Sequence, residues 1–167
     1  LTRPIKPIGF RPIPTAQQIQ QYLHHITHCS ADVFFTMLEL QHLPHIGLDF
    51  DVLDELIARI PPEEKTEQFW TKAITMNPSA FCTLPHKTPE WLNFTLQCFD
   101  DLYANKPFQP LSVLTRIYQS ITDPDEVICR AFLQRRAYLI KIMPQTAALC
   151  EFAIAQEARV IEHIQSP

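Results

Sequence analysis

The chain has 167 residues, of which 46% are apolar, and its formal net charge is −4. An acidic chain lacks the basic surface that displaces counterions from phosphates, so we expect no nucleic-acid partner. The only glycines are Gly9 and Gly47, which excludes the glycine-rich loops of dinucleotide-binding folds and kinases, and we expect no cofactor. No apolar run reaches the roughly 18 residues of a transmembrane helix, so we expect a soluble, cytoplasmic protein.

The first 14 residues carry prolines at positions 4, 7, 12 and 14 and predict an extended, proline-rich arm. Residues 15–167 predict a single helical domain, because apolar residues recur at helical spacing and no alternating run indicates a strand. The longer helices are expected over residues 16–28, 31–42, 50–60, 63–76, 89–104, 111–121, 124–135 and 146–157. Shorter second helices are expected over 79–84, 137–143 and 159–164. The fold class is all-α, an array of short helices that forms either a solenoid or an irregular helical bundle.

Histidines gather in the first predicted helix and just after the second one. His24 and His28 lie one helical turn apart, which is the spacing that a metal ion requires from one helix. The apolar residues of this helix lie on the opposite face, so we expect the two histidines to face solvent. No metal site is predicted, and His24 and His28 remain the only candidates for one.

Two pairs of residues predict where helices start. In Thr88-Pro89 and in Asp123-Pro124, a side chain that can cap a helix precedes a proline suited to the first helical position. Trp70 and Trp91 fall inside the apolar patterns of two helices, and we expect both to be core residues. The five cysteines are widely spaced and odd in number, so we expect them to be reduced and mostly buried.

An internal repeat runs through the second half of the chain. Residues 127–142 align without a gap on 149–164, which places Ala131 on Ala153 at a period of 22 residues. Upstream copies place Ala73 and Thr95 at the same position. We therefore expect repeat-like units over residues 67–88, 89–110, 125–146 and 147–167, with an inserted helix within 105–122. Units this short stack on one another, because none of them buries its apolar face alone.

The last copy carries Leu149-Cys150, Ala153-Ile154 and Ile164, and the preceding copy carries Ala131-Phe132 and Tyr138-Leu139. This pattern resembles a tandem helical repeat of unknown function found in proteins of intracellular bacteria and giant viruses. The resemblance implies a helical-repeat architecture and a secreted bacterial effector as the source, and it assigns no catalytic residue. Since the chain begins with Leu1, we expect it to be part of a longer protein that acts in the host cytoplasm after secretion.

The predicted function is protein–protein interaction, with a host protein as the partner, and the sequence favours this role over enzymatic activity. The densest positive charge in the chain is the predicted binding patch, which consists of Arg130, Arg135, Arg136 and Lys141. A positive patch on an acidic domain suits an acidic partner. One alternative is a phosphoinositide-binding module centred on Arg135 and Arg136, with peripheral membrane contact. Another is an enzyme that uses a histidine metal site or a cysteine nucleophile.

Overall fold

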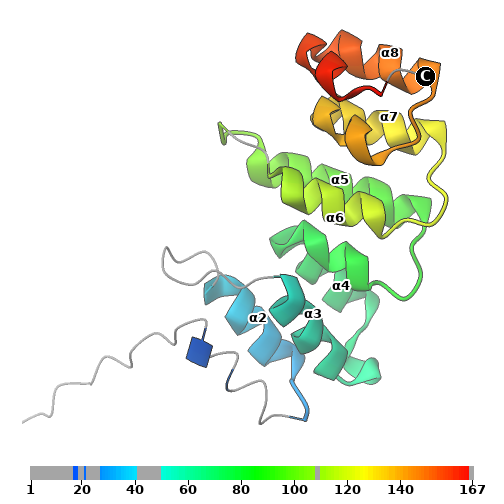
Figure 1. Ribbon diagram of the computed structural model, residues 1–167. Helices are drawn as coiled ribbons and strands as arrows, with labels where there is room; N and C mark the ends of the chain where they lie inside the picture. Colours follow the sequence, from blue (N-terminus) through cyan, green and yellow to red (C-terminus); the bar gives the residue numbers. More distant parts are fainter. Residues whose placement is uncertain (1–16, 19–20, 22–26, 41–49, 108–109, 166–167) are drawn as a thin grey trace, which may run out of the picture. The chain divides into compact units, whose positions relative to one another are not determined.

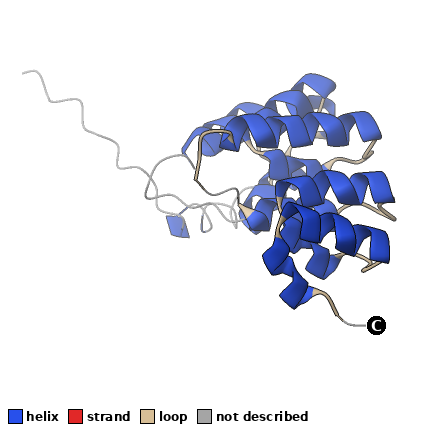
Figure 2. Cartoon of the chain, turned by 90° about the horizontal axis from the view of Figure 1, so that it is seen from above, coloured by secondary structure: helices blue, strands red, loops and turns tan. Residues whose placement is uncertain are grey.

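A computed structural model describes residues 17–18, 21, 27–40, 50–107 and 110–165 of the chain. Throughout these residues the secondary structure is helical, with no strand, which confirms the predicted all-α class (Figure 2). None of the helices in the described ranges is long and apolar enough to span a bilayer. The predicted arm over 1–14 and most of the helix predicted over 16–28, including His24, lie outside the described residues.

The chain divides into two compact units, residues 1–66 (unit 1) and 67–167 (unit 2), whereas the sequence pattern had suggested a boundary only after residue 14. The α-helices described are α2 (Ala31–Leu40), α3 (Phe50–Arg59), α4 (Glu67–Met76), α5 (Pro89–Tyr103), α6 (Leu111–Gln119), α7 (Glu126–Arg135) and α8 (Ala147–Gln156). The 3₁₀ helices are η1 (Pro62–Glu64), η2 (Pro78–Thr83), η3 (Ala137–Ile142) and η4 (Ala158–His163).

In unit 1, α2 and α3 bury apolar stripes that include Phe34, Leu38 and Leu56, and Ile60, which follows α3, is buried as well. Polar contacts join the start of α2 to the segment after α3. The backbone N–H of Cys29 donates to the carbonyl oxygen of Arg59 at 3.1 Å, and that of Ala31 donates to Glu64 Oε2 at 2.7 Å. The single helix predicted over 63–76 is instead two helices, η1 and α4, because the backbone leaves helical geometry at Lys65.

The helices of unit 2 follow one another as four consecutive pairs: α4 and η2, α5 and α6, α7 and η3, and α8 and η4. The two helices of the first, third and fourth pairs pack on each other, whereas α5 and α6 both pack against η2. In Figure 1 these pairs follow one another as layers, with α8 and η4 at the end of the unit. The 3₁₀ helix η2 packs against both α5 and α6, and η3 packs against α6, α8 and η4. Successive layers therefore pack against one another, while the repeat itself stays a prediction.

Three of these pairs share one connection. A single residue with extended backbone separates the α-helix from the 3₁₀ helix: Asn77, Arg136 or Glu157. In each case its backbone N–H donates to the carbonyl oxygen four residues earlier, at 2.8–3.0 Å. Those acceptors are Ala73, Phe132 and Ala153. We call these three pairs the hairpins of unit 2.

The hydrogen bonds give the last two hairpins an offset of 21 residues, from Arg136 to Glu157. The predicted period of 22 residues is therefore one residue too long, and Phe132, rather than Ala131, is equivalent to Ala73 and Ala153. The ungapped alignment matched two alanines, whereas the buried position accepts either alanine or phenylalanine. Ala73, Phe132 and Ala153 are all 0% exposed, while Ala131 is half-buried.

The layer formed by α5 and α6 differs from the hairpins. Helix α5 has 15 residues and runs to Tyr103, and its partner is a second α-helix. The pair spans 89–119, beyond the unit predicted over 89–110, and α6 accounts for the helix expected within 105–122. Helix α5 contains Thr95 at the position predicted for the small repeat residue. Its hydroxyl donates to the carbonyl oxygen of Trp91 at 2.7 Å, which satisfies a polar group that is fully buried.

The predicted helix start at Thr88-Pro89 is confirmed, because the Thr88 side chain accepts a hydrogen bond from the backbone N–H of Trp91. The start predicted at Asp123-Pro124 is displaced. Helix α7 begins at Glu126, and Asp125 caps it by accepting from the backbone N–H of Ile128 at 2.8 Å. Asp123 has a positive φ of 49° and belongs to the preceding turn.

The register of the hairpins gives a direct test. Ala153→Leu is expected to lower the free energy of unfolding by about 1–3 kcal/mol, because the added volume has no space at a fully buried position. The matched control is Ala131→Leu, which we expect to have a smaller effect because Ala131 is half-buried. Urea denaturation of both variants measures the difference. A larger loss for Ala131→Leu would contradict the 21-residue register.

Candidate functional site

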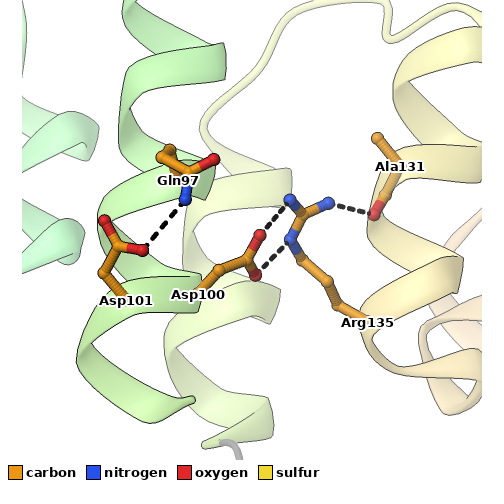
Figure 3. A network of polar contacts seen from close by, with 5 residues as sticks. All are labelled: Gln97, Asp100, Asp101, Ala131 and Arg135. Atoms are coloured by element: carbon orange, nitrogen blue, oxygen red, sulfur yellow. Dashed lines mark hydrogen bonds and ion pairs between the residues drawn. The ribbon is translucent and has the colours of Figure 1, made fainter.

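The structure places the four residues of the predicted binding patch on α7, on the residue that follows it, and on η3. Arg135 does not point freely into solvent. Its Nε donates to Asp100 Oδ1 at 2.8 Å, and its Nη2 donates to Oδ2 at 2.6 Å. Its Nη1 donates to the carbonyl oxygen of Ala131 at 2.7 Å. Figure 3 shows this arrangement, in which one guanidinium joins α7 to α5 and also binds its own helix.

The other patch residues also lie against protein groups. Arg130 donates from Nε and Nη2 to Glu126 Oε1 at 2.9 and 2.6 Å, and its guanidinium lies 5.0 Å from the centre of the Phe152 ring. Lys141 lies over the ring of Tyr138 at 5.7 Å. Arg136 is half-buried between α7 and η3. Much of the positive charge in this patch is therefore balanced within unit 2, and binding by the patch stays a prediction.

The Arg135–Asp100 pair is expected to stabilise unit 2, because bidentate geometry makes an ion pair stronger than most surface pairs. Arg135→Ala, Asp100→Ala and the double variant form a cycle from which we expect a coupling of about 1 kcal/mol, measured by urea denaturation. Lys141→Ala is the control, because this exposed residue contributes no ion pair between helices. A coupling near zero would show that the pair does not hold α7 on α5.

Among the described residues, no group of three histidine, cysteine or acidic side chains could hold a metal ion. His28 is exposed in the segment before α2, and His24 lies outside the described residues, so the predicted pair stays untested. None of the five cysteines forms a disulfide: Cys29, Cys98 and Cys129 are buried, while Cys82 and Cys150 are half-buried. Burial raises the pKa of the Cys29 thiol, and Glu64 adds to this effect. Burial also raises the pKa of the Cys98 thiol. A raised pKa disfavours the thiolate that a nucleophile requires.

Thiol labelling tests this description. At pH 8 in the native state, Cys29 and Cys98 are expected to react with iodoacetamide much more slowly than Cys82 and Cys150. Burial limits access to the first two thiols, and their raised pKa lowers the thiolate fraction. Peptide mass spectrometry after timed quenching gives the five rates. Rapid modification of Cys29 or Cys98 in the folded protein would contradict the prediction.

An apolar site in the described part of unit 2 lies along α4 and the start of α5. Two adjacent hollows of about 270 and 230 Å³ share Glu67 and Trp91. The first hollow is lined by Glu67, Thr71, Thr88, Glu90, Trp91 and Phe94. The second is lined by Glu67, Trp70, Leu84, Pro85, His86 and Trp91. We call the two together the α4–α5 groove.

The capped start of α5 positions the central side chain of this groove. Thr88 caps the helix and Pro89 occupies its first position, so Trp91 lies in the first turn, where the chain enters the helix. The Trp91 ring contacts that of Phe94 edge to face, with centres 5.8 Å apart. Both rings are half-buried, since the buried stripe of α5 runs through Leu92, Leu96 and Phe99 beside them.

Two carboxylates border these rings. Glu67 lies in the first turn of α4 and Glu90 in the first turn of α5, where the helix dipole favours negative charge. Both side chains are exposed. The groove therefore combines aromatic faces with negative charge, which suits a cation with an apolar stem, such as a lysine or arginine side chain.

The sequence prediction of two core tryptophans is correct for Trp70, which is 5% exposed, and wrong for Trp91, which is half-buried. The signal that identifies Trp91 is its place in the helix. It precedes the first residue of the buried stripe, Leu92, and shares a face with Phe94 at a spacing of three residues. Both residues lie at the border of the stripe rather than inside it.

A third hollow, of about 410 Å³, is lined by Pro85, His86, Lys87, Ser120, Ile121 and Thr122, and it is mainly polar. Its one lysine is already engaged. The ammonium of Lys87 donates to the carbonyl oxygen of Leu84 at 3.0 Å and lies over the ring of Phe81. This hollow therefore makes a weaker ligand site than the α4–α5 groove.

No family model, curated protein or solved structure matches the chain. The resemblance to short helical repeats therefore stays a prediction.

Proposed function

We propose that unit 2 is a protein-interaction module that holds a partner segment in the α4–α5 groove, with a basic side chain of the partner against Trp91. The observation that carries this proposal is the position of Trp91. Its ring forms a wall of both hollows, and it is half-buried although it belongs to a helix with a well-formed buried face.

A fixed aromatic side chain of this kind is a good anchor for binding. The Thr88 cap fixes the backbone of Trp91, and the contact with Phe94 restrains its ring. Little side-chain entropy is therefore lost when a partner covers the ring. Tryptophan is enriched among the few residues that dominate binding energy at interfaces. The two hollows beside it provide space for side chains that flank the contact.

Charge defines the chemical class of the partner. Glu67 borders both hollows and Glu90 borders one, and the whole chain has a net charge of −4. A segment that contains lysine or arginine next to an apolar residue complements these features. Long-range attraction then speeds the encounter, and the carboxylates orient the bound segment.

The groove is a better candidate than the predicted patch of Arg130, Arg135, Arg136 and Lys141. Arg135 and Arg130 are bound to carboxylates of α5 and α7, so an acidic peptide or a phosphoinositide headgroup would have to compete with these contacts. No such competition is required at Trp91. The resemblance to repeats of intracellular bacteria supports a host protein as the partner.

The proposal is tested by panning a random 12-residue peptide library displayed on phage against the full chain. We expect the enriched peptides to contain a basic residue within two positions of an apolar one. Synthetic versions should quench tryptophan fluorescence on binding, and Trp91→Ala should weaken binding at least tenfold, as measured by calorimetry. Glu67→Gln combined with Glu90→Gln should weaken binding and lower its dependence on salt.

The matched control is Gln97→Ala, because Gln97 is exposed on the same helix but outside the groove. Circular dichroism melting checks that each variant folds. If the enriched peptides bind Trp91→Ala as tightly as the unmodified chain, the groove is not the binding site. Enrichment of acidic peptides whose binding is lost in Arg136→Ala would instead support the arginine patch.

A further inference from the structure

The rings of Trp91 and Phe94 form a corner in the α4–α5 groove. Their planes are inclined at 75° and their centres lie 5.8 Å apart, so the edge of one ring meets the face of the other. Both rings are half-buried, and both line the hollow of about 270 Å³. A group that enters this hollow between the two rings contacts an aromatic face of each. We call these two rings the ring corner.

The charge beside the ring corner is negative. Glu67 and Glu90 line the same hollow, and within the described residues neither side chain forms a hydrogen bond or an ion pair. The two hydroxyls of the lining are already used. That of Thr71 donates to the carbonyl oxygen of Glu67 at 2.9 Å, and that of Thr88 accepts from the backbone N–H of Trp91 at 3.3 Å. The hollow therefore selects for a cation.

The size of the hollow suits the end of one side chain. Pockets for drug-sized ligands run from roughly 300 to 1,000 Å³, whereas this hollow measures about 270 Å³. The second hollow of the groove continues from it at Trp91 and is lined in part by Trp70, Leu84 and Pro85, so it accepts an apolar side chain next to the cation. This continuation favours a polypeptide over a separate small cation such as choline.

The ring corner suits a cation that donates no hydrogen bonds. The face of an aromatic ring attracts positive charge through its quadrupole, but it does not replace the water that an N–H group gives up. The ammonium of an unmodified lysine is compact and strongly hydrated, and it carries three donors. Methylation keeps the positive charge and replaces these donors with methyl groups that pack on the rings. A methylated lysine therefore loses less hydration on entering the hollow.

The exposure of the two carboxylates indicates the degree of methylation. Glu67 and Glu90 are exposed, so they attract the cation from the border of the hollow and are not required to accept a hydrogen bond from it. Trimethyllysine has no N–H on its side-chain nitrogen and fits this arrangement best. Arginine fits less well, because its planar fork carries five donors, for which the two rings provide no acceptor.

We infer that the ring corner is a binding site for a methylated lysine of the partner segment, with trimethyllysine as the preferred form. This inference rests on the proposed function, since it names the side chain that the partner places against Trp91. It narrows the partner from a basic segment to one whose lysine has been methylated.

Three small probes test the ring corner in the full chain: the Nα-acetyl amide of trimethyllysine, that of unmodified lysine, and the uncharged analogue in which carbon replaces the trimethylammonium nitrogen. Nuclear magnetic resonance of the tryptophan indole N–H groups measures binding, and Trp91→Phe assigns the two signals. We expect the Trp91 signal to shift and to saturate at millimolar trimethyllysine amide. The affinity for this probe should be about fivefold higher than for either of the others.

Variants of the two rings test whether both faces contribute. Trp91→Leu and Phe94→Leu should each abolish the preference for the trimethylated probe, whereas Trp91→Phe keeps an aromatic face and should retain part of it. Backbone amide signals report binding in these variants. The matched control is Gln97→Ala, which should bind all three probes like the unmodified chain, because Gln97 is exposed on α5 outside the groove. Circular dichroism melting checks that each variant folds.

The peptides enriched from the phage library separate this inference from the proposed function. Each is synthesised with lysine and with trimethyllysine, and we expect the trimethylated form to bind about fivefold more tightly by calorimetry. Peptides that bind at Trp91 with no gain from methylation would overturn the inference and leave the proposed function standing. If no peptide is enriched, the proposed function fails.

Three further results would overturn the inference. The first is the absence of a shift at Trp91 with the trimethylated amide. The second is equal affinity for the charged probe and its uncharged analogue, which would make the corner a purely apolar site. The third is binding to phosphatidylcholine vesicles without binding to trimethylated peptides, which would assign the corner to a lipid headgroup.

Discussion

The structure of unit 2 depends on a connection of one residue. Asn77, Arg136 and Glu157 each have an extended backbone between an α-helix and a 3₁₀ helix, and each closes a hydrogen bond to the fourth residue before it. A connection this short holds the second helix close to the first, so a hairpin of this size has one surface facing the layer before it and another facing the layer after it. Neither surface is covered by the hairpin itself. Covering by neighbouring layers is thus a condition of stability.

The proposed binding surface arises where this regular arrangement changes. The α4–α5 groove lies where a hairpin is followed by a pair of α-helices, and where the Thr88 cap starts α5 with Trp91 in its first turn. Longer helices and a different connection leave the aromatic border of the α5 stripe partly uncovered. Binding surfaces in stacked helical units are expected at such departures, because the repeated contacts elsewhere are already satisfied within the chain.

Helical spacing and caps were sufficient to predict the class of the fold and the positions of most helices. The Thr88-Pro89 start was predicted because its signal is local, whereas the α7 start was displaced because Asp123 and Asp125 both offer a capping carboxylate within three residues. The repeat register depended on which residue lies at the crossing of helices. Sequence similarity favoured Ala131, but Phe132 fills that position, and its ring packs edge to face against Tyr118 of α6 at 5.4 Å. Which residue fills the helix crossing depends on contacts with the neighbouring layer, and the sequence of the hairpin alone does not indicate it.

The arginines of α7 and the carboxylates of the α4–α5 groove differ in whether neighbouring layers already bind them. The arginines of α7 are the densest positive charge in the sequence, yet Arg135 binds Asp100, a residue 35 positions earlier, and so its charge serves to join α7 to α5. Glu67 and Glu90 belong to no site predicted from the sequence, but they border a groove whose walls are aromatic and half-buried. A charge contributes most to recognition when it lies beside an apolar anchor and is not already paired. The binding site of this chain is therefore expected where charged side chains are not already paired within the stacked helices. The groove meets this condition better than the arginine patch.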